Sequence, residues 1–127
     1  MPKLAIRTPN APAPVARYSQ GIIIDDTLYI QGVIAIDPQT GRLVDGDIKA
    51  QSERVFESIR AILDAAGMTM PDIVKVSAFL ENLSDYAKFN QAYDSYFQND
   101  PPPVRTTVQA KLPFGALVEV EVIARKA

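Results

Sequence analysis

One arginine and two glutamates near the end of the chain are the side chains best suited to chemistry. Arg105 lies in an extended run over residues 103–110, and Glu119 and Glu121 alternate with valines over residues 117–123. A planar guanidinium can hold a carboxylate through two parallel hydrogen bonds, and a glutamate can polarise a water molecule. We expect the two runs to be strands that lie close together. The pattern therefore indicates hydrolysis of a small anionic substrate.

The residue types that the sequence lacks restrict this chemistry further. There is no cysteine and no histidine, which excludes a thiolate nucleophile, a Ser-His-Asp triad and zinc held by cysteine. Acid–base chemistry is left to Asp, Glu, Lys and Tyr side chains, ordered water or the main chain. The formal net charge is −2, so no basic field attracts nucleic acid, and a nucleic-acid partner is not expected.

Length and hydropathy predict one domain that spans residues 1–127. No apolar stretch approaches the roughly 20 residues that cross a bilayer. The first residues also lack the apolar core and the cleavage site of a secretory signal. We therefore expect a cytoplasmic protein with no membrane partner.

The first half of the chain is predicted to begin with an extended segment and a hairpin. Residues 1–16 are rich in proline and are expected to lie on the surface without helical structure. Residues 18–24 and 27–36 are two β-branched runs separated by acidic turn residues, which is typical of a hairpin. Gly32 lies inside the second run, where a glycine indicates a bulge or a close approach by a ligand or another backbone.

The rest of the chain alternates between helices and strands. A helix is predicted from an N-cap at Asp47 to a C-terminal glycine at Gly67, followed by a strand over residues 72–80. Ser84 is expected to cap a second, aromatic-rich helix that prolines 101–103 end, and two strands follow. The order β-β-α-β-α-β-β predicts an α+β domain with both helices on one face of a single mixed sheet. We expect homo-oligomerisation to cover apolar residues on the other face.

Short motifs along the chain carry a family resemblance. They are NAP at residues 10–12, RYSQG at 17–21, QG at 31–32, DPQTG at 37–41, AAG at 65–67, DIVK at 72–75, FNQAY at 89–93, PVR at 103–105 and VEVE at 118–121. In this order and spacing they resemble those of the Rid (YjgF-type) proteins, the reactive-intermediate deaminases. The resemblance covers nearly the whole chain.

The resemblance implies both an architecture and an activity. The architecture is a chorismate-mutase-like α+β fold that assembles as a homotrimer with three clefts between subunits. The activity is hydrolysis of reactive 2-imino acids, which form from enamines such as 2-aminoacrylate, to 2-keto acids and ammonia. An enzyme of this 2-iminobutanoate/2-iminopropanoate deaminase type needs no cofactor and no metal.

The resemblance also implies roles for the two charged residues that could do chemistry. Arg105 would bind the substrate carboxylate, and Glu119 would position the attacking water. From the residues alone, Arg105 could equally belong to a surface or interface salt bridge. Glu119 and Glu121 could both be solvated residues of a half-exposed strand, since alternation places them on one face.

Four further positions are expected to bind substrate or shape the site. By resemblance Tyr18 and Gly32 would line the cleft, Asn90 would contact substrate, and Thr107 would contribute main-chain hydrogen bonds. The alternatives are a tyrosine packed on the sheet, an ordinary bulge glycine, and a structural hydrogen bond from the second helix. Gln31 replaces the serine that is more common in the family and is expected to change the shape of the cleft. The strand from residue 105 to 113 is one residue shorter than in typical members, which affects how Arg105 and Glu119 are placed.

Two other classes of function remain open from the sequence. One is a non-catalytic trimer that binds 2-keto acids or acts like a chaperone. The other is a ribonuclease or translation inhibitor, as described for some members of the family, although the absence of histidine and the net charge of −2 weigh against it. Within the enzymes, a deaminase specialised for one pathway is a third possibility.

Overall fold

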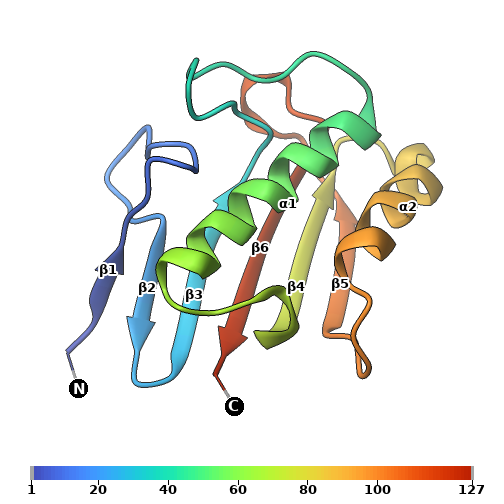
Figure 1. Cartoon of the computed structure of the whole chain (residues 1–127). Helices are drawn as coiled ribbons and strands as arrows, with labels where there is room; N and C mark the ends of the chain where they lie inside the picture. Colours follow the sequence, from blue (N-terminus) through green and yellow to red (C-terminus); the bar gives the residue numbers. More distant parts are fainter. Residues whose placement is uncertain (1, 127) are drawn as a thin grey trace.

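A single six-stranded sheet with two helices on one face makes up the fold (Figure 1). The computed structural model describes residues 2–126. The helices are α1 (Ile48–Ala65) and α2 (Tyr86–Tyr96), and the strands are β1 (Leu4–Ile6), β2 (Gly21–Ile24), β3 (Thr27–Val33), β4 (Ile73–Leu80), β5 (Val104–Gln109) and β6 (Val118–Arg125). Their order in the sheet is β1-β2-β3-β6-β4-β5, with β4 and β5 parallel and the other pairs antiparallel. The predicted α+β class, with two helices on one face of a mixed sheet, is confirmed.

Helix α1 begins and ends where its sequence signals predict. The Asp47 side chain accepts a hydrogen bond from the Ala50 N–H at 3.1 Å, which satisfies one of the free donors of the first turn. Gly67, with a φ of +72°, follows the helix in the left-handed conformation that favours glycine. The face that α1 turns to the sheet is apolar, and Val55, Ile59 and Ile62 on it are fully buried.

The start of α2 differs from the prediction. Ser84 does not cap it, because residues 83–85 form a separate 3-10 turn, η2 (Leu83–Asp85). Asn82 caps that turn by accepting a hydrogen bond from the Ser84 N–H at 2.9 Å. The α-helix then begins at Tyr86.

The N-terminal segment is more ordered than its proline content suggests. Leu4–Ile6 pairs with β2 as an edge strand, so the sheet gains a strand that the sequence did not predict. The buried Gln20 side chain anchors the segment that follows, donating to the carbonyl oxygens of Thr8, Ala11 and Pro12. A strand of three residues has little sequence signal of its own, and here it is stabilised by pairing with β2.

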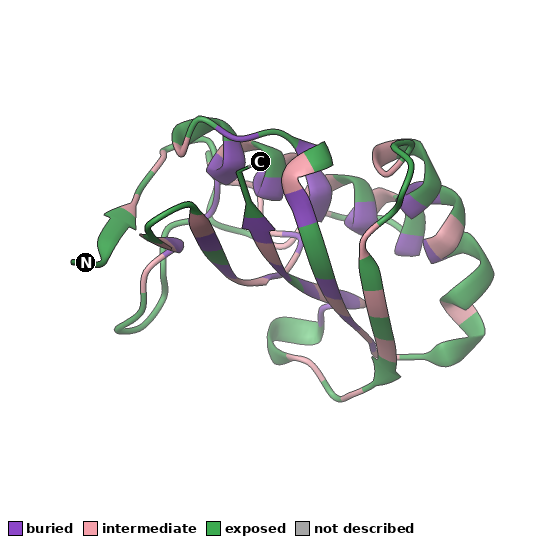
Figure 2. Ribbon diagram, turned by 90° about the horizontal axis from the view of Figure 1, so that it is seen from below, coloured by how far each residue is buried: buried purple, intermediate pink, exposed green. Residues whose placement is uncertain are grey.

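The core lies between the sheet and the helices. Along β6, Val118, Val120 and Val122 are buried, whereas Glu119 and Glu121 point to the opposite face, as the alternation predicts. Figure 2 shows the same contrast, with buried positions where the helices face the strands. The aromatic stripe of α2 joins this core through Phe89 and Tyr93, which are buried.

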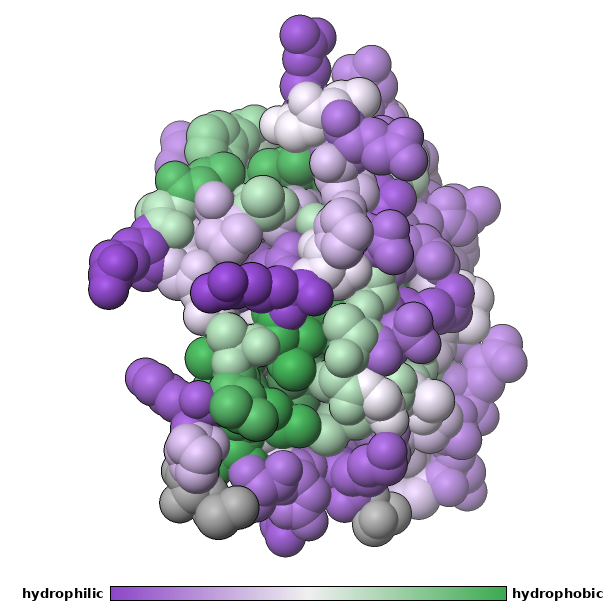
Figure 3. Space-filling model, turned by 60° about the vertical axis from the view of Figure 1, so that its left-hand side comes forward, coloured by the Kyte–Doolittle hydropathy of each residue, from purple (hydrophilic) through white to green (hydrophobic). Residues whose placement is uncertain are grey.

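The face of the sheet away from the helices is open and partly apolar. Val74, Val104 and Val108 on the strands at that end of the sheet are between 42 % and 66 % exposed, and Tyr29 of β3 is also exposed. Figure 3 shows that apolar side chains also reach the surface on the side that carries β1. No helix among residues 2–126 combines the length and the apolar character that crossing a membrane requires.

Candidate functional site

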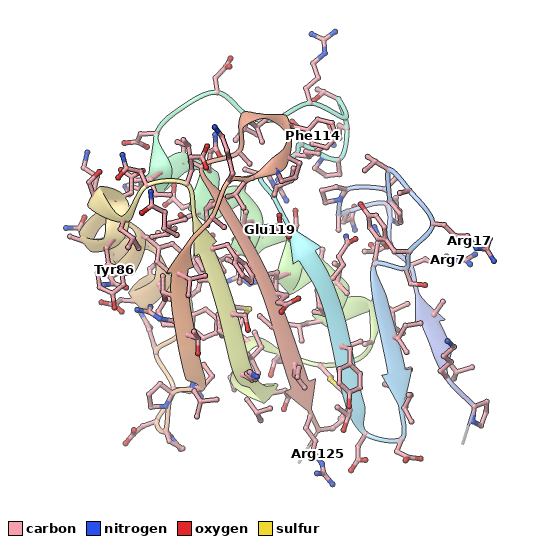
Figure 4. All side chains as sticks on the ribbon, turned by 180° about the vertical axis from the view of Figure 1, so that it is seen from behind. Arg7, Arg17, Tyr86, Phe114, Glu119 and Arg125 are labelled. Carbon is pink, nitrogen blue, oxygen red and sulfur yellow. The ribbon has the colours of Figure 1, made fainter. Side chains whose placement is uncertain are left out.

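Glu119 lies in a cleft at one end of the sheet. The cleft has a volume of about 550 Å³ and is walled by the end of β3, by residues 12–19 and by the 3-10 turn η3 (Pro113–Gly115). Figure 4 shows Phe114 of this turn just beyond Glu119, past the end of β3. Tyr18, Gln31 and Gly32 line the same cleft. We call it the Glu119 cleft.

Gly32 is what allows the Glu119 side chain to reach its place. A Cβ atom on Gly32 would overlap the Glu119 Oε2 atom and would lie 3.1 Å from Cδ. The pairing of β3 with β6 is also irregular between Ile30 and Val33, so the glycine combines a bulge with a close approach. The bulge reading of this glycine therefore applies, whereas the close approach is made by a side chain and not by a ligand or another backbone.

The environment of Glu119 favours its protonated form. Burial of the carboxyl group is the main cause that raises its pKa above the ordinary value of 4.5, and the nearby Glu121 carboxylate raises it further. Arg105, which was expected near this carboxyl group and could have lowered its pKa, lies on the edge strand β5 in the same chain. A carboxylate with a raised pKa is better suited to accept a proton near neutral pH than an ordinary glutamate.

Tyr18 faces the cleft instead of packing on the sheet. Its side chain is 48 % exposed, and its hydroxyl accepts a hydrogen bond from the Val15 N–H at 3.3 Å. This contact orients the ring at the wall formed by the N-terminal segment. The hydroxyl accepts in this contact and keeps its own proton to donate to a ligand.

Arg105 lies at the other edge of the sheet, against α2. Its guanidinium donates a hydrogen bond to the Tyr86 hydroxyl at 2.9 Å and lies 4.6 Å from the centre of the Tyr93 ring and 5.6 Å from that of Phe89. Among the described residues no carboxylate lies within salt-bridge distance of it. The aromatic rings hold the guanidinium through cation–π contacts and leave its capacity to bind an anion free.

The strands that carry Arg105 and Glu119, expected to lie close together, are not adjacent in the sheet of one chain. Strand β4 lies between β5 and β6, and the two side chains point to opposite faces, Arg105 towards α2 and Glu119 towards the open face. Figure 4 shows that the two sites are apart: Tyr86, which accepts the hydrogen bond from Arg105, lies beyond the β5 edge of the sheet, and Glu119 lies between β6 and β3. Because β5 pairs in parallel with β4, the connection between them must cross over, and α2 forms it. The chain then passes β4 and enters the sheet again as β6, between β3 and β4.

Comparison with known proteins identifies the family. The family model described as endoribonuclease L-PSP matches residues 8–126, and a RutC family protein of Pyrococcus horikoshii is 46% identical over 125 residues, which cover 98% of each chain. The chain belongs to this Rid (YjgF-type) family. A 2-iminobutanoate/2-iminopropanoate deaminase of Dermatophagoides farinae is 38% identical over 96% of this chain and 95% of its own. The crystal structure of RidA from an Antarctic Psychrobacter has a TM-score of 0.92 at 42% identity, covering 97% of this chain and 99% of its own.

Two of the remaining predicted positions of this Rid-family chain gather around Arg105. Thr107 follows it by two residues on β5 and so shares its face, and Asn90 follows Tyr86 by one turn of α2. The Thr107 Oγ1 and Asn90 Oδ1 atoms are buried and have no hydrogen-bond partner among the described residues. The structural hydrogen bond considered for Asn90 is therefore not made by this oxygen. We call Arg105, Thr107 and Asn90 the Arg105 group.

Two residues of the Glu119 cleft, Gln31 and Phe114, are not explained by the Rid resemblance. The Gln31 Oε1 atom is buried without a hydrogen-bond partner among residues 2–126, and it lies where this chain departs from the common family residue. Phe114 was not singled out from the sequence. The signal that could have found it is an aromatic residue beside a glycine in the Leu112–Gly115 turn.

The described residues hold no cluster of three or more acidic, histidine or cysteine side chains that could bind a metal ion. The side chains that could take part in chemistry form two separate sets on one chain. The Glu119 cleft supplies a carboxylate with a raised pKa, and the Arg105 group supplies a cation and unpaired polar atoms. Each set lacks what the other provides.

Proposed function

We propose that this protein hydrolyses 2-imino acids to 2-keto acids and ammonia in clefts between the subunits of a homotrimer. Each cleft would combine the Arg105 group of one subunit with the Glu119 cleft of its neighbour. The observation that carries the proposal is the separation of Arg105 and Glu119 on opposite faces of one sheet. A second copy of the chain can supply to each cleft the group that the first copy lacks.

In this mechanism the two subunits hold opposite ends of the substrate. Arg105 binds the carboxylate through its guanidinium, and a main-chain carbonyl near residue 105 or 107 accepts a hydrogen bond from the protonated imine nitrogen. The C2 atom then faces a water molecule held by Glu119. Fixing both reactants in this way removes much of the entropic barrier to the addition.

The proton steps need only one carboxylate. Water adds to C2, and Glu119 takes one of its protons as the C–O bond forms. Glu119 then returns that proton to the nitrogen, and the C–N bond breaks as the regenerated carboxylate takes the hydroxyl proton and the hydroxyl oxygen becomes the keto oxygen. The released ammonia takes this proton from Glu119 and leaves as ammonium. The raised pKa of Glu119 suits a group that must both accept and return a proton.

Two further observations support the trimer and the reaction. The open face of the sheet exposes apolar residues such as Val104 and Val108, which a neighbouring subunit would cover. The Dermatophagoides farinae relative is named as a deaminase of this type. A ribonuclease function, which the description of the family model names, is disfavoured because the chain has no histidine and a net charge of −2.

Mixing two inactive variants tests whether the site is shared between subunits. We expect Arg105→Ala and Glu119→Gln each to lower imine hydrolysis by about a hundredfold or more, and trimers assembled at random from equal amounts of both to recover about a quarter of the wild-type activity. In those mixed trimers an intact Arg105 meets an intact Glu119 across a subunit boundary. The measurement is 2-keto acid release after co-refolding, with each variant refolded alone as the control.

The outcomes separate the possibilities clearly. No recovery, in mixed samples that have the size of a trimer, contradicts a shared site. A wild-type protein that binds 2-keto acids but does not accelerate the hydrolysis of any imine is a binding protein and not a deaminase.

Gly32→Ala should lower kcat/KM by about a hundredfold without unfolding the protein, because a misplaced catalytic group costs about that much. The new Cβ would overlap the Glu119 Oε2 atom, and this flexible side chain would move away. Gly41→Ala is the control for lost stability, since no atom lies within 4 Å of the new Cβ but the φ of +73° is unfavourable for alanine; it should lower Tm and leave kcat/KM unchanged. Activity that survives in Gly32→Ala would show that the present position of the Glu119 carboxylate is not the working one.

A further inference from the structure

The wall of the Glu119 cleft is apolar apart from a few groups. Eight of its lining residues are aliphatic, proline or phenylalanine, and they come from three separate segments of the chain, including residues 12–15 and 33–36. The polar side chains that line it are Tyr18, Ser19, Gln31 and Glu119. None of the described residues that line the cleft is a lysine or an arginine. A charged substrate side chain would lose its hydration here without gaining an opposite charge.

Phe114 at the rim of this cleft is placed in a way that the stability of the fold does not explain. Its side chain is 67 % exposed, so the ring contributes little to the core. Its φ is +60°, in the left-handed region that is unfavourable for a bulky side chain. Glycine would suit this backbone better, and strained residues of this kind cluster at ligand-binding sites.

The size of the cleft exceeds what the reacting atoms need. On a single chain the cleft has a volume of about 550 Å³, which lies in the range of pockets that enclose much larger ligands than a three-carbon imino acid. Once the carboxylate and C2 are held by Arg105 and Glu119, the remaining space is bounded by apolar residues and by the Phe114 ring. An alanine-derived imine would leave this space unfilled.

We propose that the Glu119 cleft selects 2-imino acids with branched aliphatic or aromatic side chains, and that Phe114 is the specificity-determining residue. This inference rests on the proposed function, since it assigns the substrate class of the same site. The substrate side chain packs against the Phe114 ring and the aliphatic wall, and this burial adds to the binding energy. Acidic side chains are rejected because Glu119 is the charged residue among those that line this wall, and because Arg105 of the neighbouring subunit already holds the carboxylate common to all 2-imino acids.

The test compares imines of leucine, phenylalanine, alanine and glutamate, generated by amino-acid oxidases and followed by 2-keto acid release. For the wild type we expect kcat/KM for the leucine and phenylalanine imines to exceed that for the alanine imine by about tenfold. We expect the glutamate imine to be the poorest substrate. The preference should appear mainly in KM, because the side chain is bound away from the reacting atoms.

Phe114→Gly is the informative variant, because it separates a role in binding from a role in folding. The ratio of kcat/KM for the leucine imine to that for the alanine imine should fall by about tenfold. Tm should stay the same or rise, since glycine relieves the left-handed backbone. Asp25→Gly is the matched control, because Asp25 has a φ of 54° in the turn between β2 and β3 and does not line the cleft. It should leave the ratio unchanged.

Several results would overturn the proposal. A wild type that prefers the alanine imine or the glutamate imine contradicts the substrate class, and an unchanged ratio in Phe114→Gly contradicts the role of Phe114. If the protein accelerates the hydrolysis of no imine, the proposed function fails. The selectivity of the cleft is then tested separately, by comparing the Kd for 4-methyl-2-oxopentanoate with the Kd for pyruvate. Tighter binding of the larger keto acid, weakened in Phe114→Gly, supports the inference, whereas equal binding or none refutes it.

Discussion

Arg105→Ala should lower kcat/KM for 2-imino acid hydrolysis by about a hundredfold or more, because the substrate carboxylate loses its partner and its orientation. Arg105→Lys keeps the positive charge and loses the paired hydrogen bonds of the guanidinium, so it should recover only part of the activity. The measurement is steady-state 2-keto acid release with an imine generated in place. The Arg105→Ala loss should appear in KM as well as in kcat.

The control for Arg105 must separate chemistry from stability. Arg105 lies over the Tyr93 ring, so its removal also loosens the contact between β5 and α2, and Tm should be measured for each variant. Arg125→Ala removes an exposed arginine whose contact with Asp26 is 3.8 Å long, and it should keep wild-type activity. Full activity in a folded Arg105→Ala variant would place the carboxylate site elsewhere.

Glu119→Gln should lower kcat by about 10²–10⁴-fold, the usual contribution of a general base. In the wild type, kcat/KM should fall in acid with a midpoint above 4.5, since the pKa of Glu119 is raised and the protonated carboxyl cannot accept a proton. In Glu119→Gln this acid limb should disappear from the residual rate. The measurement is a pH–rate profile of both proteins.

The same substitution should not destabilise the protein at neutral pH. The folded-state pKa of Glu119 lies above its unfolded value, so the stability that the group contributes is present below the unfolded pKa and is lost as the pH rises through the folded one. At neutral pH the buried carboxylate is therefore a cost that glutamine removes. Tm of Glu119→Gln should equal or exceed that of the wild type. If the acid limb of the pH–rate profile persists in Glu119→Gln, a group other than Glu119 causes it.

Most of the fold could be predicted because its signals are local. The Asp47 cap and Gly67 set the ends of α1, and the alternation along β6 set which side chains face the core. The exceptions have no strong local signal. Strand β1 consists of Leu4–Ile6 and depends on pairing with β2. The first turn of the second helical region is a 3-10 turn, because Asn82 and not Ser84 provides the cap.

The candidate site was predictable in its residues but not in its geometry. The motifs that resemble the Rid family contain Arg105 and Glu119, and the structure places Glu119 in a cleft with Tyr18 and Gly32. The sequence could not show that Arg105 belongs to a different edge of the sheet. Phe114 was missed because its importance comes from a positive φ and from exposure at the rim of the cleft, and neither follows from residue type.

By itself, the sequence determined the types of the elements, the faces on which side chains lie and the chemistry that is possible without histidine or cysteine. Each of these depends on residues that are close together in the chain, since side-chain alternation and caps are local properties. Only the tertiary structure decided that β4 separates β5 from β6 and that Arg105 and Glu119 face opposite ways. Strand order depends on pairing between segments that are distant in the chain. After the crossover that follows β4, β5 pairs at the edge of the sheet, and β6 lies between β3 and β4.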